Sequence, residues 1–361
     1  MSALVTPTIE SLVPYEGGKP IEELARELGV TGAVKLASNE NPLGPSPRAL
    51  EAMQRLLGSV HLYPDGAAWV LRQAIARVHD VPMEEVIHGN GSNELLDLFV
   101  RTFTRPEDHI VFAEPAFIVY RIASLAHGVP FTAVPLKELT HDLDAMAAAV
   151  TSRTRLMFVA NPNNPTGTYV GREAVERLLS RLPPEVIVVM DEAYIHYADA
   201  PDFPDSLALR HLRERLLVVR TFSKIYGLAG LRVGYAVGPA KLIDYVNRVR
   251  APFNVSALAQ AAAIASLDDA EHVSRSREHN LGERARVSAG LSRLGVAVAP
   301  SQANFVLVDL GRAARPVYDA LLRRGVIVRP FASLPTSLRI TIGTATENDR
   351  LLEAMAAVLR A

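Results

Sequence analysis

The sequence contains no cysteine among its 361 residues. This absence excludes disulfide bonds, thiolate nucleophiles and cysteine-ligated metals, and we expect no metal centre. An excess of one charge is also missing, since the formal net charge is −1. The composition therefore gives no reason to expect nucleic acid or a membrane surface as a partner. A chain without cysteine fits a cytoplasmic setting.

Long apolar runs are missing as well. A membrane-spanning helix needs roughly 20 apolar residues, whereas the best candidate, residues 257–267, is short and rich in alanine. Residues 1–11 lack the basic start and apolar run of a signal peptide, so none is expected. What the chain does have is an ordinary globular composition, 49% hydrophobic and 21% charged, over a length that predicts two domains.

From about residue 84 onward, short β-branched runs alternate with longer helical patterns. This alternation predicts a mainly parallel sheet with helices on both faces, which is an α/β fold. The expected strands are 86–88, 110–113, 131–134, 156–160, 186–190, 216–220 and 233–237. The expected helices between them are 93–104, 118–127, 172–182 and 240–250.

After residue 250 the pattern changes to that of a smaller α+β unit. Its expected helices are 257–267, 271–294, 314–323 and one beginning at 347; its expected strands are 296–299, 304–308, 326–329 and 338–342. The predicted domain organisation is an N-terminal arm that forms part of the small domain (1–40), a large domain (41–250) and a small C-terminal domain (251–361).

Four polar loops follow predicted strands directly: 89–94, 161–168, 191–194 and 221–224. Ligands of parallel sheets bind beyond the carboxyl ends of the strands. We therefore expect these loops to meet at one site.

The segment from Thr221 to Arg232 carries the most chemical information. A lysine at the end of a buried strand, such as Lys224, can be desolvated, which lowers its pKa and frees its amine for imine formation. Thr221, Ser223 and Arg232 could bind a dianionic phosphate. The alternative for Lys224 is a solvated lysine in a turn.

Two further strand ends carry polar groups. Asp191 follows a buried run and needs a cationic partner, which a pyridinium nitrogen would provide; the alternative is a helix N-cap. Tyr194 could donate to the phenolic oxygen of the same ring, and Asn164, in a turn rigid with proline and glycine, could bind that oxygen too. The alternative for Asn164 is simply a tight turn.

Other candidates are weaker when taken alone. The loop from Gly89 to Glu94 could cradle a phosphate on backbone amides, but Glu94 replaces the third glycine of a dinucleotide-binding motif. Tyr15, Tyr63 and Tyr120 could contact a ligand, although ordinary packing is the commoner role of such aromatics. Arg329 and Arg339 lie in strand patterns, where they either face solvent or clamp a carboxylate or phosphate.

Together these segments resemble the aspartate-aminotransferase superfamily of pyridoxal-phosphate enzymes and, within it, the histidinol-phosphate aminotransferase family. The resemblance runs from Tyr15 through residues 36–47 to Arg339. It depends on N-P-T-G at 164–167, D-E-A-Y at 191–194 and S-K-x-x-G-L-A-G-L-R at 223–232, in this order. It implies a fold type I transferase, a homodimer, and transfer of an amino group from L-histidinol phosphate to 2-oxoglutarate in histidine biosynthesis.

The resemblance also implies a role for each candidate. Lys224 would hold pyridoxal 5′-phosphate as an imine and move a substrate proton, Asp191 would pair with the pyridine nitrogen, and Tyr120 would stack on the ring. Asn164 and Tyr194 would hold the phenolic oxygen. The phosphate of the cofactor would be held by Ser92, Asn93, Thr221, Ser223, Arg232 and, across a dimer interface, Tyr63. Substrate would be bound by Tyr15, Arg329 and Arg339.

Alternative functions remain open from the sequence. An aromatic aminotransferase of the phenylalanine type shares most motifs, although segments 39–42 and 252–256 favour histidinol phosphate. A decarboxylase of a phosphorylated amino acid is a second alternative. A ligand-sensing regulator would need a DNA-binding domain, for which the motifs leave no room, and a nicotinamide oxidoreductase rests only on the imperfect glycine loop.

Overall fold

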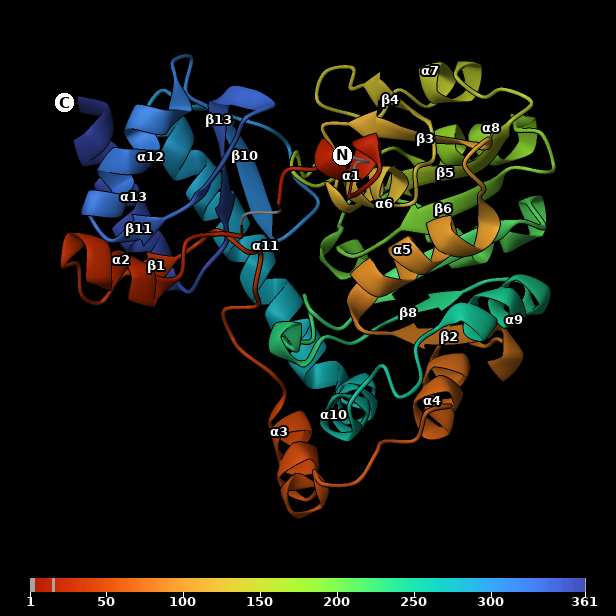
Figure 1. The fold of residues 1–361 in the computed structure, drawn as a ribbon. Helices are drawn as coiled ribbons and strands as arrows, with labels where there is room; N and C mark the ends of the chain where they lie inside the picture. The colour runs from red at the N-terminus through yellow and green to blue at the C-terminus, as the bar shows by residue number, and fades with distance from the viewer. Residues whose placement is uncertain (1–3, 15–16, 361) are drawn as a thin grey trace.

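The computed structural model describes residues 4–14 and 17–360. Within these residues, the larger body is built on a seven-stranded sheet with the order β2-β8-β7-β6-β5-β3-β4 (Figure 1). Its strands are β2 (Val86–Gly89), β3 (His109–Glu114), β4 (Phe131–Pro135), β5 (Thr154–Ala160), β6 (Ile187–Asp191), β7 (Leu216–Thr221) and β8 (Gly234–Val237). All seven predicted strands are confirmed.

The sheet is mainly parallel, as predicted. Only β8 runs against its neighbours, β2 and β7, while the remaining pairs are parallel. The central strands are buried along almost their whole length. This burial explains their continuous runs of valine, isoleucine and leucine, because helices cover both faces of a parallel sheet.

Each face of this sheet packs against its own helices. One face is covered by α5 (Gly91–Phe103), α6 (Val119–Ala126) and α9 (Ala240–Val249), the other by α7 (Leu143–Ala148) and α8 (Arg172–Arg181). Beyond β2 and β8, a third apolar cluster joins α3 (Pro47–Gln54), α4 (Trp69–His79) and α10 (Ala257–Leu267). Short 3-10 turns connect these elements: η1 (Leu57–Ser59), η2 (Met83–Glu85), η3 (Ile195–Tyr197), η4 (Ser206–Leu212) and η5 (Ala229–Leu231).

The smaller body lies beside the carboxyl ends of the parallel strands (Figure 1). It contains a four-stranded sheet in the order β12-β13-β10-β9 and a pair, β1-β11. These strands are β1 (Val34–Lys35), β9 (Ala297–Val298), β10 (Phe305–Asp309), β11 (Val326–Ile327), β12 (Arg329–Phe331) and β13 (Leu334–Thr341). Its helices are α2 (Ile21–Leu28), α11 (Ala270–Arg293), α12 (Ala314–Arg323) and α13 (Ala345–Arg360).

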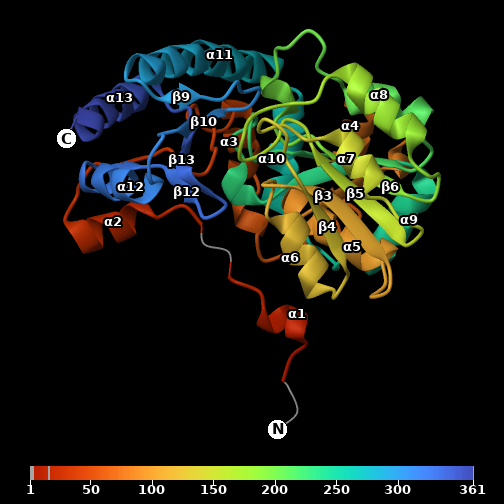
Figure 2. The same cartoon turned by 90° about the horizontal axis from the view of Figure 1, so that it is seen from above.

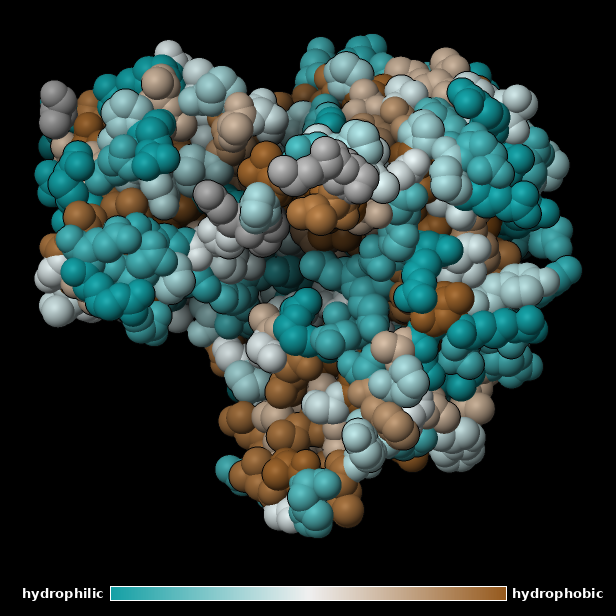
Figure 3. Space-filling view, viewed as in Figure 1, coloured by the Kyte–Doolittle hydropathy of each residue, from teal (hydrophilic) through white to brown (hydrophobic). Residues whose placement is uncertain are grey.

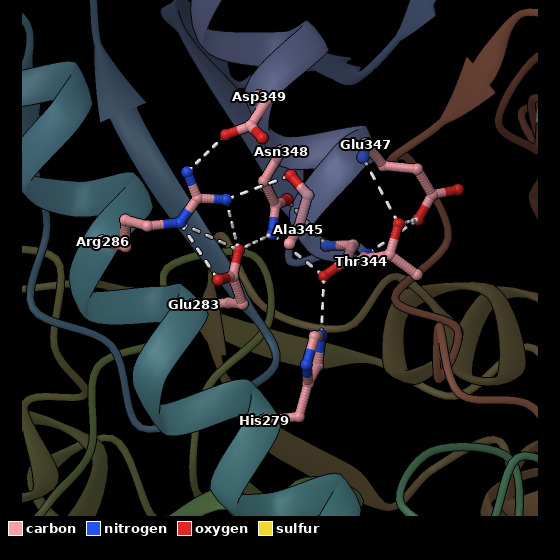
Figure 4. A network of polar contacts seen from close by, with 9 residues as sticks. His279, Glu283, Arg286, Thr344, Ala345, Glu347, Asn348 and Asp349 are labelled. Atoms are coloured by element: carbon pink, nitrogen blue, oxygen red, sulfur yellow. Dashed lines mark hydrogen bonds and ion pairs between the residues drawn. The ribbon is translucent and has the colours of Figure 1, made fainter.

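A polar network fixes α11 to the start of α13 (Figure 4). Arg286 binds Glu283 on its own helix and Asp349 on α13, with 2.5 Å between Nη1 and Oδ1 of Asp349. Asn348, which is fully buried, donates to Glu283 and to the carbonyl of Gly343. These contacts hold α11 and α13 together. They therefore help to stabilise the small body, which includes β13.

Two features of the chain path bear on the predicted domain limits. The parallel pairing of β1 with β11 places Val34 and Lys35 in the small body. Helix α10, however, packs on α3 and α4 at the base of the large body, although it lies within the range 251–361.

Helix α1 (Pro7–Glu10) lies apart from both sheets, beside α6 (Figure 2). Among the described residues, no helix has the length and apolar character that crossing a bilayer requires.

Candidate active site

A cavity of about 630 Å³ opens where the carboxyl ends of the parallel strands face the small body. Residues from all four polar loops line it, so the predicted convergence is correct. The predicted residues in its wall are Ser92, Asn93, Asn164, Asp191, Tyr194, Thr221, Ser223, Lys224, Arg232 and Arg339. Strands β2, β5, β6 and β7 point the same way, which is why loops far apart in sequence meet here.

Lys224 lies in the wall of this cavity, three residues after β7. Its Nζ donates to the carbonyl of Ser38 at 3.2 Å and lies 5.7 Å from the centre of the Tyr194 ring. Burial, assisted by the positive charge of Arg339, lowers the pKa of Lys224 to about 7. A large fraction of this amine is therefore neutral near pH 7, and a neutral amine is a nucleophile and a base.

Asp191 ends β6 and is 4% exposed. Its Oδ2 accepts a hydrogen bond of 2.7 Å from the Tyr120 hydroxyl, and its Oδ1 accepts a longer one, 3.3 Å, from the backbone N–H of Ala193. Burial raises the pKa of Asp191 to about 6. In the described part of the chain, no lysine or arginine nitrogen forms an ion pair with this carboxylate. The site thus presents a buried acid to a cationic or N–H ligand.

Tyr120 occupies a place that the sequence did not predict. It is completely buried, its ring stacks on Phe158 at 4.8 Å, and it does not line the cavity. Tyr120 therefore faces the core and not the cavity, because its position in the first turn of α6 turns the ring inward. Phe117, in the loop before α6, is the aromatic residue that lines the cavity on this side.

The start of α5 and the loop after β7 form a corner of the cavity whose polar groups suit an anion. Ser92 and Asn93 lie in the first turn of α5, where free N–H groups and the helix dipole favour a phosphate. Arg232 packs so closely on Gly91 that a Cβ there would lie 2.6 Å from its guanidinium. Arg232 itself has a φ of 54°, a left-handed conformation that costs energy in a non-glycine residue and is common at functional sites.

Arg339 lies on the opposite side of the cavity, on β13. Its Nη1 donates to Asn164 Oδ1 at 2.5 Å, and its Nη2 donates to the carbonyl of Ala37 at 2.6 Å. Arg329 is its direct partner across the β12–β13 pair, so the two side chains project from the same face. Arg329 does not line the cavity itself but donates to Gly17, which forms part of the cavity wall.

Tyr63 is a further predicted residue that does not line this cavity. Tyr63 is 83% exposed, stacks on Phe253 at 4.7 Å and belongs to another surface of its own chain. Tyr15 lies outside the described residues. Sequence reasoning also missed Asn39, a buried residue of the cavity wall whose amide donates to the Tyr194 hydroxyl at 2.9 Å. Its position within the 36–47 motif was the available clue.

The comparisons with known proteins agree with this geometry. Residues 31–355 match the family described as aminotransferase class I and II. The chain is 49% identical over 362 residues to a histidinol-phosphate aminotransferase of Anaeromyxobacter sp., covering 99% of this chain and 100% of that protein. It is 52% identical over 361 residues to histidinol-phosphate aminotransferase 2 of Pseudomonas aeruginosa, covering 99% and 98%.

Solved structures give the same result. The histidinol-phosphate aminotransferase of Sinorhizobium meliloti, solved with pyridoxal-5′-phosphate, superposes with a TM-score of 0.91 at 31% identity, covering 99% of each chain. The match extends over both bodies and all the motifs of the cavity. The chain belongs to the aminotransferase class I and II family, whose members depend on pyridoxal phosphate.

Proposed function

We propose that this protein is a histidinol-phosphate aminotransferase, which transfers the amino group of L-histidinol phosphate to 2-oxoglutarate. The observation that carries the proposal is the pairing, in one cavity, of an amine with a pKa near 7 and a buried carboxylate that has no cationic partner among the described residues. Relatives of that name, 49% and 52% identical over the full length, support the choice of substrate.

The residues of the cavity fit pyridoxal 5′-phosphate. Asp191 offers its carboxylate to a protonated pyridine nitrogen, and the corner formed by Ser92, Asn93 and Arg232 suits a dianionic phosphate. Thr221 and Ser223 add hydroxyls at this corner. The cofactor, when bound, supplies a protonated ring that takes up the electron pair left at the α-carbon of the substrate.

Lys224 is proposed to act twice. Its amine would hold the cofactor covalently until the amine of the substrate takes its place. Once released, Nζ accepts the α-proton, for which a pKa near 7 is well matched to neutral pH. The carbonyl of Ser38, 3.2 Å from Nζ, orients the amine in the cavity.

Other residues would orient the ring. Asn164 and Tyr194 would bind its phenolic oxygen, and Phe117, rather than Tyr120, would cover its face. Tyr120 would act on Asp191 instead, since its hydroxyl donates to the carboxylate and favours the charged form.

The basic groups near the cavity suit both substrates. Arg339 would form a bidentate pair with the carboxylate of glutamate or 2-oxoglutarate. Arg329, beside Arg339 on β12, would receive the phosphate of histidinol phosphate together with Tyr15. A second cation is required here because this substrate has a phosphate where glutamate has a carboxylate.

A homodimer is part of the proposal. Apolar side chains gather at the lower end of the molecule around α3 and the segment after it (Figure 3). In this segment Leu57, Val60, Leu62 and Tyr63 are 56%, 63%, 62% and 83% exposed. Single exposed apolar residues are ordinary, but a contiguous group marks an interface. Contact with a second copy would bring Tyr63 to the phosphate of the partner's cofactor.

A cytoplasmic location also belongs to the proposal, consistent with the lack of cysteine.

The proposal is tested by comparing kcat/KM for histidinol phosphate and phenylalanine, each with 2-oxoglutarate. A strong preference for histidinol phosphate is expected because phenylalanine has no phosphate for Arg329. Equal or better use of phenylalanine would instead assign the chain to the aromatic aminotransferases. Release of carbon dioxide from a phosphorylated amino acid, without a ketone product, would indicate a decarboxylase.

A further inference from the structure

Asn39 connects the two bodies of the protein at the cavity. It lies in the segment between β1 and α3, it is 1% exposed, and its φ is 56°. Its amide nitrogen donates to the Tyr194 hydroxyl of the large body at 2.9 Å. Its other amide atom, Oδ1, accepts from the Thr341 hydroxyl of β13 at 3.0 Å.

The hydrogen bonds around Thr341 determine which way the Asn39 amide faces. The backbone N–H of Asn39 donates to Thr341 Oγ1 at 2.9 Å, so that oxygen is already an acceptor. The Thr341 side chain is 3% exposed, and its single proton therefore needs a protein acceptor. Oδ1 of Asn39 is in reach and can only accept. The amide oxygen consequently faces Thr341, and the N–H₂ group faces Tyr194.

This orientation fixes the role of the Tyr194 hydroxyl as well. An amide N–H₂ group can only donate, so the Tyr194 oxygen accepts from Asn39 and its own proton points elsewhere. The ring is held on the cavity wall by an edge-to-face contact with Phe305 at 5.2 Å, and Lys224 lies over it at 5.7 Å. With the ring fixed, the remaining directions for the O–H bond include the cavity.

We propose that Asn39, oriented by Thr341, is a positioning residue that makes Tyr194 a hydrogen-bond donor toward the cavity. The inference rests on the proposed function, in which Tyr194 binds the phenolic oxygen of the cofactor. Asn39 touches neither reacting atom; it acts by occupying the acceptor side of the Tyr194 hydroxyl. Because Thr341 belongs to the small body, the direction of the Tyr194 proton depends on how the two bodies meet.

The test uses the holoenzyme and the pH midpoint of its visible absorbance. The proton of the imine between Lys224 and the cofactor is stabilised by the phenolic oxygen. A hydrogen-bond donor to that oxygen weakens this stabilisation, so it lowers the pH midpoint of the absorbance change. Tyr194→Phe should raise the midpoint by about one pH unit. Asn39→Asp retains the shape of the side chain but presents an acceptor, which would capture the Tyr194 proton. It should raise the midpoint by a similar amount.

A double variant separates this effect from a simple change in local charge. A carboxylate at position 39 could raise the midpoint through space, and that contribution would persist without the Tyr194 hydroxyl. We expect Asn39→Asp to add little to the midpoint in the Tyr194→Phe background, so that the two shifts are strongly non-additive. Full additivity of the shifts would overturn the proposal, as would a wild-type midpoint in Asn39→Asp.

The Thr341 variants test the orientation without touching Asn39. Thr341→Val removes the hydroxyl that fixes the amide, and we expect part of the Asn39→Asp shift; Thr341→Ser retains the hydroxyl and should retain the wild-type midpoint. Equal midpoints in the Val and Ser variants would overturn the role of Thr341. An unchanged midpoint in Tyr194→Phe alone would refute the proposed role of Tyr194, a different failure from that of Asn39.

Asn39→Gly suits the positive φ and replaces the Asp variant if the latter does not fold. Asn39→Gly removes the amide acceptor and the amide donor together, and we expect it to shift the pH midpoint less than Tyr194→Phe does. A shift of the midpoint as large as that in Tyr194→Phe, or no shift at all, would contradict the role of Asn39.

Discussion

The Tyr120 hydroxyl lies 2.7 Å from Asp191 Oδ2 and donates to it from within the core. Burial raises the pKa of the Asp191 carboxyl to about 6, and this hydrogen bond opposes the rise. A hydrogen bond to the charged form favours it. Tyr120 therefore helps to keep Asp191 ionised, which is the form that pairs with a protonated ring nitrogen.

Tyr120→Phe should weaken cofactor binding. Hydrogen bonds to charged groups are worth about 1.5–3 kcal/mol, so we expect the Kd of pyridoxal phosphate for the apoenzyme to rise by roughly 10- to 100-fold. The Kd is measured by titrating apoenzyme and following the visible absorbance. Tyr169→Phe is the matched control, since it removes a 2.6 Å bond to Asp202 outside the cavity. Equal Kd values for the two variants would contradict the role of Tyr120.

Lys224 should make the apoenzyme more stable at alkaline pH. Its pKa is about 7 in the folded chain and 10.5 ordinarily. Between these values the unfolded chain binds a proton that the folded chain does not, so the free energy of unfolding rises as the pH rises from 7 toward 10.5. Between pH 7 and 9 the increase should be about 2 kcal/mol.

The measurement is urea unfolding of the apoenzyme at pH 7 and pH 9. Lys224→Met should lose this increase, and it should be more stable than the wild type at pH 7. Lys241→Met, at an exposed position of α9, should retain the wild-type dependence. The same pH dependence in Lys224→Met and the wild type would show that the amine is not desolvated.

Arg329→Met should separate the two substrates. The loss of a charge-assisted contact with the phosphate is expected to raise KM for histidinol phosphate by roughly 10-fold or more. KM for 2-oxoglutarate should change little, because Arg339 remains. Arg323→Met, an exposed arginine on α12, controls for the loss of one positive charge. Equal increases of both KM values would indicate that Arg329 supports the structure and does not bind the phosphate of the substrate.

Tyr63 should act in the site of the partner subunit. Lys224→Ala and Tyr63→Phe subunits are each expected to give weak or inactive homodimers. A mixed dimer contains one site with both an intact Lys224 and an intact Tyr63, if Tyr63 comes from the partner. Activity should therefore rise above that of either parent after the subunits are mixed and reassociated. No gain on mixing, in dimers shown to be hybrid, would place Tyr63 outside the partner's site.

The fold was largely predictable because the signals were local. Each strand of the large sheet is a short β-branched run that ends in a polar loop, and parallel pairing brings such loops to one edge. Lys224, Asp191 and Asn164 were therefore found from strand ends alone. The base of the large body was less predictable: α10 follows the last strand of the large sheet but packs on α3, a contact that its alanine-rich sequence does not specify.

Side-chain direction was the part that the sequence did not provide. Phe117 and Tyr120 are three residues apart, and only the start of α6 at Val119 decides which ring faces the cavity. Helix boundaries are uncertain by one or two residues from sequence, which is enough to exchange their roles. Asn39 was missed for a similar reason, since its contacts with Tyr194 and Thr341 join residues 155 and 302 positions apart.

The most direct test of the account is to locate the cofactor on the chain. Reduction of the holoenzyme with borohydride, followed by peptide mass spectrometry, converts the imine into a stable bond and identifies the lysine that forms it. We predict pyridoxyl phosphate on Lys224, and its loss, with the visible absorbance and the activity, in Lys224→Ala. The label on Lys19, Lys35, Lys137 or Lys241 instead would contradict the assignment of this cavity as the active site.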